Sequence, residues 1–504
     1  MYTGGFKNDK LNLVHSVNQN VNIVVKTPVG KTTKGSIHNV VMQGDVLGPM
    51  LCSKQVDSIA KECLDEHKYT YTYRDKVEIP PLSMVDDLVC ISECGFRSVM
   101  VNEYLQCKSN SKKLQFGPSK CKKIHIGKQN KDMRCHALFV EKWEEREVDQ
   151  LNTEEKIIED VCIGRVEMEE MVEEKYLGDV ISADGKNLKN IKSRVNKGKG
   201  ISRRIINILE GIPFGRLYFQ VAVLLRNSLL VSSLLCNSEA WFGLTNQELD
   251  LLETVDLAFL RNILKAPKST PKEMFFLELG ILPLREMIRE RRLNFLHYIL
   301  KQDANSILFK IFEVQLETRT KKDWVSTILN DMQICQIGVT FAEIQAMNKV
   351  KWKNIIKRHI EEKTFKDLET SKINHSKVRK IEHKSLMMQD YLLPNRQEIS
   401  KEDIEMIFKL RCKVIHVKMN MKALYKSFLC EICEKYEESQ SHIYECDKIW
   451  EIRKSEKVIQ PNYEMIENGN MNEQMMIAKI FRENFKILQK YRMIKKLPYQ
   501  EMDS

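Results

Sequence analysis

Near its C-terminal end the sequence places three cysteines and one histidine in a spacing that few folds accommodate. Cys430, Cys433, His442 and Cys446 form the pattern C-x2-C-x8-H-x3-C within seventeen residues. Three thiolates and one imidazole are enough to close a tetrahedral structural zinc site with no open position. We therefore expect a zinc knuckle over residues 426–450 that stabilises the local fold and does not catalyse. The alternative is a group of reduced cysteines in a lysine-rich tail.

Two adjacent carboxylates, Asp86 and Asp87, stand between two short apolar runs in the segment Pro81–Ile91. The pattern predicts a strand, a tight turn and a buried strand, with both acids at the bend. Adjacent carboxylates repel each other, so a divalent cation that prefers oxygen ligands would stabilise the pair. The alternative is an ordinary Asp-Asp turn, which needs no ion.

The residues around this bend predict a mixed α+β region. Residues 18–42 alternate apolar and polar side chains about a Pro-Gly turn, which is typical of a β-hairpin. Gly48 and Pro49 open a segment with apolar residues at helical spacing, and a second such segment follows the acidic bend. We expect helices packed on one side of an antiparallel sheet.

The distribution of charge favours a polyanionic partner. The chain carries a net charge of +11, but residues 141–174 hold 14 acidic and 4 basic residues, a balance of −10, which leaves +21 for the remainder. Residues 186–204 hold eight basic residues and no acidic one. Such a segment suits a phosphate backbone, and the alternative is a solvated helix.

Beyond residue 200 the spacing of apolar residues predicts helices almost throughout. The most apolar window, Leu217–Leu235, is interrupted by Arg226, which favours a buried core helix over a membrane span. No apolar run typical of a secretory signal opens the chain, so most of the 14 cysteines are expected to be reduced core thiols.

In this order the motifs resemble the C-terminal part of the reverse transcriptase of a non-LTR, or LINE-like, retrotransposon. The resemblance runs with gaps from about residue 20 to about residue 450. It rests on the zinc-knuckle pattern and on these short motifs: Gln43-Gly44 with Gly48-Pro49, Met84-Val85-Asp86-Asp87, Lys120 in a Phe-Gly-Pro-Ser-Lys-Cys segment, and Tyr176-Leu177-Gly178.

The resemblance implies a domain order. Residues 1–185 would be a partial palm with an acidic excursion at 141–174, and residues 186–300 a helical basic thumb. A helical region at 301–425, the zinc knuckle at 426–450 and a helical basic tail at 451–504 would follow.

The resemblance also implies roles for individual residues. Asp86 and Asp87 would hold Mg²⁺ at the primer end, and Lys120 would protonate the leaving pyrophosphate. Gln43 and Gly44 would lie under the templating base of the RNA, and Tyr176 and Gly178 would position the DNA primer. The residues expected to hold nucleic acid on the thumb are Lys192, Arg194, Lys197, Lys199, Arg203 and Arg204.

One departure from the family's pattern limits the activity we expect. The family uses a third catalytic carboxylate on a strand before the Gln-Gly motif, whereas residues 1–44 hold only Asp9, in a polar segment. We therefore expect an N-terminally truncated reverse transcriptase that lacks the fingers and is inactive alone. The alternatives are a non-catalytic RNA- or DNA-binding protein and a translated relic with no present role.

Overall fold

The computed structural model describes most of the chain. The described residues are 21–24, 26–27, 30–31, 35–37, 48–66, 69–85, 87–111, 116–127, 136–142, 162–212, 217–320, 322–393, 400–453 and 460–496, with Thr33, Leu114 and Phe214. They form two compact units. The first comprises Met1–Glu174, Ser182–Gly185 and Asp303–Val314, and the second comprises Lys175–Ile181, Lys186–Gln302 and Gln315–Ser504.

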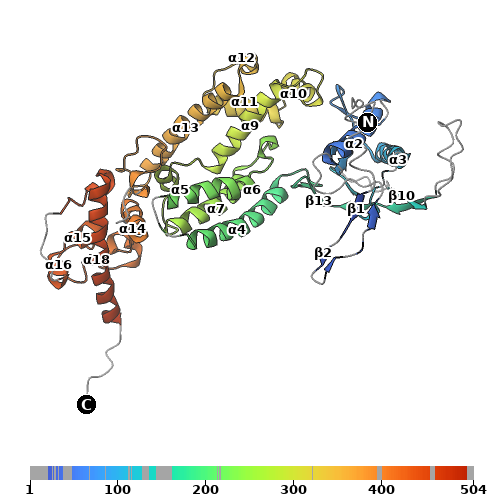
Figure 1. Ribbon diagram of the computed structural model, residues 1–504. Helices are drawn as coiled ribbons and strands as arrows, with labels where there is room; N and C mark the ends of the chain where they lie inside the picture. The colour runs from blue at the N-terminus through green and yellow to red at the C-terminus, as the bar shows by residue number, and fades with distance from the viewer. Residues whose placement is uncertain are drawn as a thin grey trace, which may run out of the picture. The chain divides into compact units, whose positions relative to one another are not determined.

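The first unit mixes short strands with two long helices (Figure 1). Its strands are β1 (Val21–Ile23), β2 (Lys26–Thr27), β3 (Gly30–Lys31), β4 (Gly35–Ile37), β5 (Tyr71–Tyr73), β6 (Val77–Ile79), β7 (Leu82–Met84), β8 (Asp87–Val89), β9 (Lys122–Ile124), β10 (His136–Lys142), β11 (Cys162–Glu167) and β12 (Glu169–Met171). Its helices are α2 (Gly48–Asp65), α3 (Gly95–Ser111) and the 3₁₀ turn η2 (Pro118–Lys120). The expectation of a mixed α+β fold is confirmed.

The strands pair differently from our expectation. Within the described residues every ladder has two strands, β9 and β12 pair in parallel, and no wider antiparallel sheet is present. The hairpin expected at residues 18–42 is confirmed, because β1 pairs with β4 and β2 with β3. The strand after the acidic bend, β8, is only half-buried, because a two-stranded ladder leaves one face and both edges uncovered.

The helices of the first unit build a small core. Pro49 lies in the first turn of α2, where its missing N–H leaves no donor unsatisfied. Ile59 and Cys63 of α2 are buried against Val101 and Leu105 of α3. The segment 143–161, which includes most of the expected acidic excursion, lies outside the described residues.

The second unit is helical. The hairpin of β13 (Glu173–Tyr176) and β14 (Asp179–Ser182) leads into it. Its longer helices are α4 (Leu188–Glu210), α5 (Tyr218–Leu225), α7 (Asn246–Ile263), α8 (Lys272–Leu279), α9 (Leu284–Leu300), α10 (Ile307–Thr318, shared with the first unit), α11 (Trp324–Ile334), α13 (Lys349–Ile373), α14 (Lys401–Arg411) and α18 (Met471–Lys496). Its shorter helices are η3 (Arg226–Val231), α6 (Ser232–Leu234), η4 (Ser238–Ala240), α12 (Phe341–Ala346), η5 (Asp390–Leu392), η6 (Lys418–Asn420), η7 (Lys422–Leu424), α15 (Gln440–Glu445), α16 (Asp447–Arg453) and α17 (Met465–Asn468).

Helix α4 packs closely on α6 and α7 in the core of this unit (Figure 1). Gly198 of α4 lies against Leu234, and a Cβ added at Gly198 would come 2.5 Å from Leu234 Cδ2. A larger residue at this position would therefore force Leu234 to move. The apolar window at residues 217–235 is a core segment, as expected, and its Arg226 is buried in an ion pair with Asp256 at 2.6 Å.

No described helix is both long enough and apolar enough to cross a membrane. The expectation of helices over 186–300, 301–425 and 451–504 is confirmed for the described residues.

Candidate metal centre and nucleic-acid interface

The structure brings the four metal-ligand candidates together. The Sγ atoms of Cys430, Cys433 and Cys446 and a ring nitrogen of His442 all lie within 4.8 Å of one another. Ligands about 2.3 Å (sulfur) and 2.0–2.1 Å (nitrogen) from a tetrahedral zinc ion would be separated by roughly 3.6–3.8 Å. The observed separation of Cys433 Sγ and His442 Nε2 is 3.3 Å. The cluster therefore fits a zinc ion after a small adjustment.

Local hydrogen bonds explain why these residues converge. Cys430 N donates to Tyr436 O at 2.7 Å and Glu434 N donates to Cys430 O at 2.9 Å, which closes a tight turn around the first two cysteines. Ser439 caps α15 by accepting a hydrogen bond from His442 N at 3.0 Å. The short helix α15 then presents His442 in its body and Cys446 at its end.

Hydrogen bonds within the cluster shift the pKa values of its members. A hydrogen bond between Cys430 and Cys446 raises the pKa of Cys430 to about 12 and lowers that of Cys446. A hydrogen bond with Cys430 raises the pKa of His442. Zinc requires thiolates and a neutral imidazole, so its binding would displace these protons. Zinc affinity should consequently fall as the pH falls.

The surface around the cluster carries charges of both signs and one exposed aromatic ring. Lys426, Lys435 and Lys448 are exposed, but the same segment also exposes Glu434, Glu437, Glu445 and Asp447, so it is not a purely basic platform. The side chain of Tyr436 is 66% exposed, and its ring centroid lies 5.6 Å from that of His442. Exposed rings beside cations suit contact with nucleotide bases.

Helix α4 presents the second cluster of candidate residues. Five of the six proposed basic contacts on this helix are exposed: Lys192, Lys197, Lys199, Arg203 and Arg204. At 100° per residue, they lie on an arc opposite the buried face of the helix, which includes Ile191, Val195 and Ile205. Within the part of the chain that the structure describes, none of the five has an ion-pair partner.

The sixth candidate, Arg194, does not belong to this surface. Its side chain is buried, donates a hydrogen bond to Asp179 Oδ1 at 2.7 Å and lies over the ring of Trp241. In the sequence Arg194 is one of several basic residues in a continuous run. In the helix, the 3.6-residue periodicity turns its side chain toward the core.

Asp179 is a structural residue that the sequence pattern did not reveal. Besides Arg194, its carboxylate accepts hydrogen bonds from Asn190 at 2.7 Å and Asn237 at 2.6 Å. Burial alone would raise the pKa of Asp179, but these donors outweigh it and hold the pKa below its usual value. The hydrogen-bonded carboxylate therefore anchors β14 to α4.

The expected primer-positioning residues lie just before Asp179. Tyr176 ends β13, and the next two residues, Leu177 and Gly178, have φ angles of 47° and 90°. Positive φ at both central residues is typical of a type I′ turn, for which glycine is the favoured second residue. Tyr176 is half-buried and Gly178 is exposed.

The acidic bend forms the expected turn. β7 and β8 pair antiparallel, with Met84 opposite Asp87, and Val85 at the bend has φ of 61°. Asp87 is exposed, whereas Asp86 lies outside the described residues. Among the described residues only the Cys/His cluster gathers three or more side chains able to hold a metal ion. The described residues therefore give no support to the Mg²⁺ expectation.

Three candidates remain: Lys120, Gln43 and Gly44. Lys120 is exposed at the end of η2, and its backbone N–H donates to Gly117 O at 2.9 Å. Gln43 and Gly44 lie outside the described residues.

Comparison with known proteins adds no relative. No protein-family model matches the chain, and no curated protein or solved structure is significantly similar to it. Functional inference must therefore start from the residues and their geometry.

Proposed function

We propose that this chain is a reverse-transcriptase-derived protein that binds RNA or DNA without catalysis, with α4 as its principal contact and the zinc knuckle as a second one. The single observation that carries the proposal is the exposed arc of unpaired cations on α4, described above. Cations without carboxylate partners are free to neutralise phosphates, and each such contact releases counterions from the polynucleotide.

Two features favour α4 as a binding surface over a solvated helix. The helix is fixed from behind by a continuous buried face and by the Asp179 anchor, so its cations project from a rigid element. A rigid element loses less conformational entropy on binding than a mobile tail does. The surrounding charge also favours the approach of a polyanion, because the chain outside residues 141–174 is strongly basic.

The Cys/His cluster supports the proposal in a different way. A structural zinc ion would fix the turn around Cys430 and Cys433 and hold the exposed side chains of Lys435 and Tyr436 in place. The purified chain should then contain about one zinc ion, and Cys433→Ser should reduce zinc content by more than tenfold at limiting zinc. Atomic absorption measures the content, and Cys412→Ser, at a buried cysteine outside the cluster, is the matched control.

Salt-dependent binding of a labelled single-stranded RNA tests the role of α4. Replacing Lys192, Lys199 and Arg203 together by alanine should weaken binding and lower the slope of log K against log salt by about 2, since each single-strand phosphate contact contributes about 0.7. Fluorescence anisotropy measures both. Circular dichroism should be unchanged, because all three side chains are exposed.

A matched variant removes the same charge elsewhere on the second unit. Lys301, Lys366 and Lys479 are exposed lysines outside α4, and their joint replacement by alanine should leave the salt slope unchanged. Equal losses in the two variants would show that only net charge matters, and the assignment of α4 would be wrong. Binding without any salt dependence would overturn the proposal itself.

Polymerase activity is tested separately. The β7–β8 bend resembles a catalytic hairpin, so any DNA synthesis by this chain should depend on it. We expect no primer extension on an RNA template with Mg²⁺. DNA synthesis that is lost on Asp87→Asn would contradict the proposed absence of catalysis.

A further inference from the structure

The first three turns of α13 carry a second group of exposed cations. Residues 348–360 hold five basic side chains of lysine or arginine and no acidic one. All five are exposed: Lys349, Lys351, Lys353, Lys357 and Arg358. Neither Lys351 nor Arg358 has a carboxylate partner within the described ranges.

The remainder of the same helix shows the opposite arrangement. Lys363 contacts Glu286 at 2.8 Å and Asp367 at 2.9 Å, and Lys372 contacts Glu369 at 2.7 Å. Lys363 and Lys372 in the second half of α13 are thus used within the protein. In the first half, Lys357 contacts Glu361 at 3.8 Å, whereas Lys351 and Arg358 face solvent without such partners in the described ranges.

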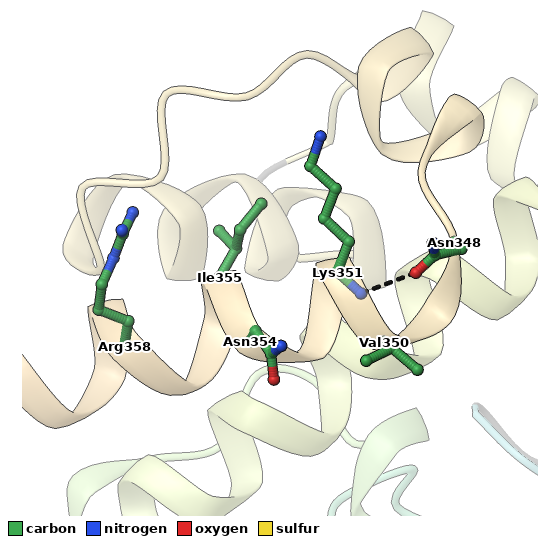
Figure 2. A pocket seen from close by; sticks show the side chains of 6 residues that line it. All are labelled: Asn348, Val350, Lys351, Asn354, Ile355 and Arg358. Atoms are coloured by element: carbon green, nitrogen blue, oxygen red, sulfur yellow. Dashed lines mark hydrogen bonds between the residues drawn. The ribbon is translucent and has the colours of Figure 1, made fainter.

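A hollow of about 500 Å³ lies on this basic half. Its lining consists of Asn348, Val350, Lys351, Asn354, Ile355 and Arg358. Figure 2 shows Lys351, Ile355 and Arg358 extending from the same side of the helix. Since an α-helix rises 1.5 Å per residue, Lys351 and Arg358 start about 10 Å apart along its axis. The two cations are therefore spaced to contact separate phosphates of one strand.

The helix that carries the hollow, α13, is held in place by packing and by an N-terminal cap. On the opposite side of α13, Trp352, Ile356 and Ile360 are fully buried, and Trp352 Nε1 donates to Leu293 O at 3.0 Å. Asn348 caps the helix by accepting from Lys351 N at 2.8 Å (Figure 2). The backbone carrying the cations is held before any ligand arrives.

The chemistry of the lining favours a polynucleotide over a small carboxylate. Arg358 offers a planar fork and Lys351 a compact charge, and both donors suit phosphate oxygens. Asn354 adds an amide that can pair with a base edge, and Ile355 adds an apolar surface between the cations. A ligand long enough to meet all of these groups carries several phosphates and bases.

We propose that this hollow is a further contact for the sugar-phosphate backbone of a single RNA or DNA strand. The inference rests on the proposed function, namely that the chain binds nucleic acid, but it concerns a different helix. Lys351 and Arg358 would neutralise two phosphates, while Asn354 and Ile355 contact the nucleoside between them.

The test replaces Lys351 and Arg358 together by alanine in the full chain. Affinity for a labelled single-stranded RNA should fall about tenfold at moderate salt, and the salt slope should fall by about 1.4, that is, 0.7 for each lost contact. Photo-crosslinking of RNA that carries 4-thiouridine should label peptides from residues 348–358 in the unchanged protein. The double variant should lose this label.

The matched control replaces Lys366, exposed later on the same helix, and Lys479 by alanine. Its affinity and salt slope should equal those of the unchanged protein. An unchanged Lys351/Arg358 variant, when the α4 variant is weakened, would overturn this inference and leave the proposed function intact. If the unchanged protein binds no RNA, the proposed function fails first.

Competition separates a polynucleotide from a small anion. Inorganic phosphate and a nucleoside monophosphate should displace the labelled RNA only at concentrations far above those of an unlabelled strand. Equal displacement by inorganic phosphate at matched phosphate concentration would identify a small-anion site and contradict the inference.

Discussion

Two hairpin bends in this protein carry carboxylates that behave in opposite ways. At the β13–β14 bend, Asp179 accepts hydrogen bonds from three side chains and ties its strand to α4. At the β7–β8 bend, Asp87 is exposed and has no described partner. Both bends belong to motifs of the same resemblance, yet one carboxylate is a structural anchor and the other is available to a ligand.

The same contrast between paired and unpaired charge extends through the second unit. Glu278 of α8 is completely buried and contacts Arg411 at 3.0 Å, His383 at 3.2 Å and Tyr391 at 2.9 Å. Within the described residues, the five exposed cations of α4 and the α13 cations Lys351 and Arg358 have no such partners. Paired charge therefore identifies the parts that hold the unit together, and unpaired charge identifies candidate binding surfaces.

Glu278→Gln is expected to have the largest effect on stability. The change leaves the buried guanidinium of Arg411 without a counter-charge, which should lower the free energy of unfolding by about 3–5 kcal/mol. Urea denaturation followed by circular dichroism measures the loss. Glu362→Gln, at an exposed carboxylate of the same unit, is the control, and an equal loss in both variants would refute the contrast.

Lowering the pH should weaken the same network without a mutation. Burial alone would raise the pKa of Glu278, but Arg411 and the hydrogen bonds from His383 and Tyr391 hold it at about 2, below the usual 4.5. This contribution is present above pH 4.5 and is lost as the pH falls toward 2, on the order of 3 kcal/mol. Unfolding measured against pH should be less steep over this window in Glu278→Gln.

Asp179→Ala should have an intermediate effect. It leaves the buried guanidinium of Arg194 and the amides of Asn190 and Asn237 without their shared acceptor, so we expect a loss of about 1–3 kcal/mol. Thermal denaturation measures it. If stability is unchanged, Asp179 does not anchor the hairpin, and the comparison between the two bends fails.

Asp87→Asn should have the smallest effect. The carboxylate is exposed and unpaired, so the free energy of unfolding should change by less than about 0.5 kcal/mol. RNA affinity should also stay the same, because the proposed contacts lie elsewhere. A marked destabilisation would show that Asp87 has a structural role like that of Asp179.

Much of the local architecture could be predicted from the sequence. The hairpin at residues 18–42, the helix opened by Gly48 and Pro49, the turn between β7 and β8 and the helices of the second unit all follow from short-range periodicity and turn chemistry. The convergence of the four zinc-ligand candidates could also be predicted, because they lie within seventeen residues and a turn plus one short helix suffices to join them.

Other features could not be predicted because they depend on residues far apart in the chain. The prediction of a multi-stranded sheet was wrong for the described residues, because strand periodicity does not show which strands pair. Nor does the basic run at 186–204 show that Arg194 is buried while Lys192 is exposed.

The sequence by itself determined where this protein turns, where its helices run and which four side chains can meet a zinc ion, because these depend on neighbours along the chain. Only the tertiary structure decided which charges are paired. Glu278 meets Arg411 across 133 residues, whereas the five exposed α4 cations described above, and Lys351 and Arg358 of α13, meet no carboxylate in the described structure. Whether a charged side chain is paired depends on packing between distant elements, which local periodicity does not predict.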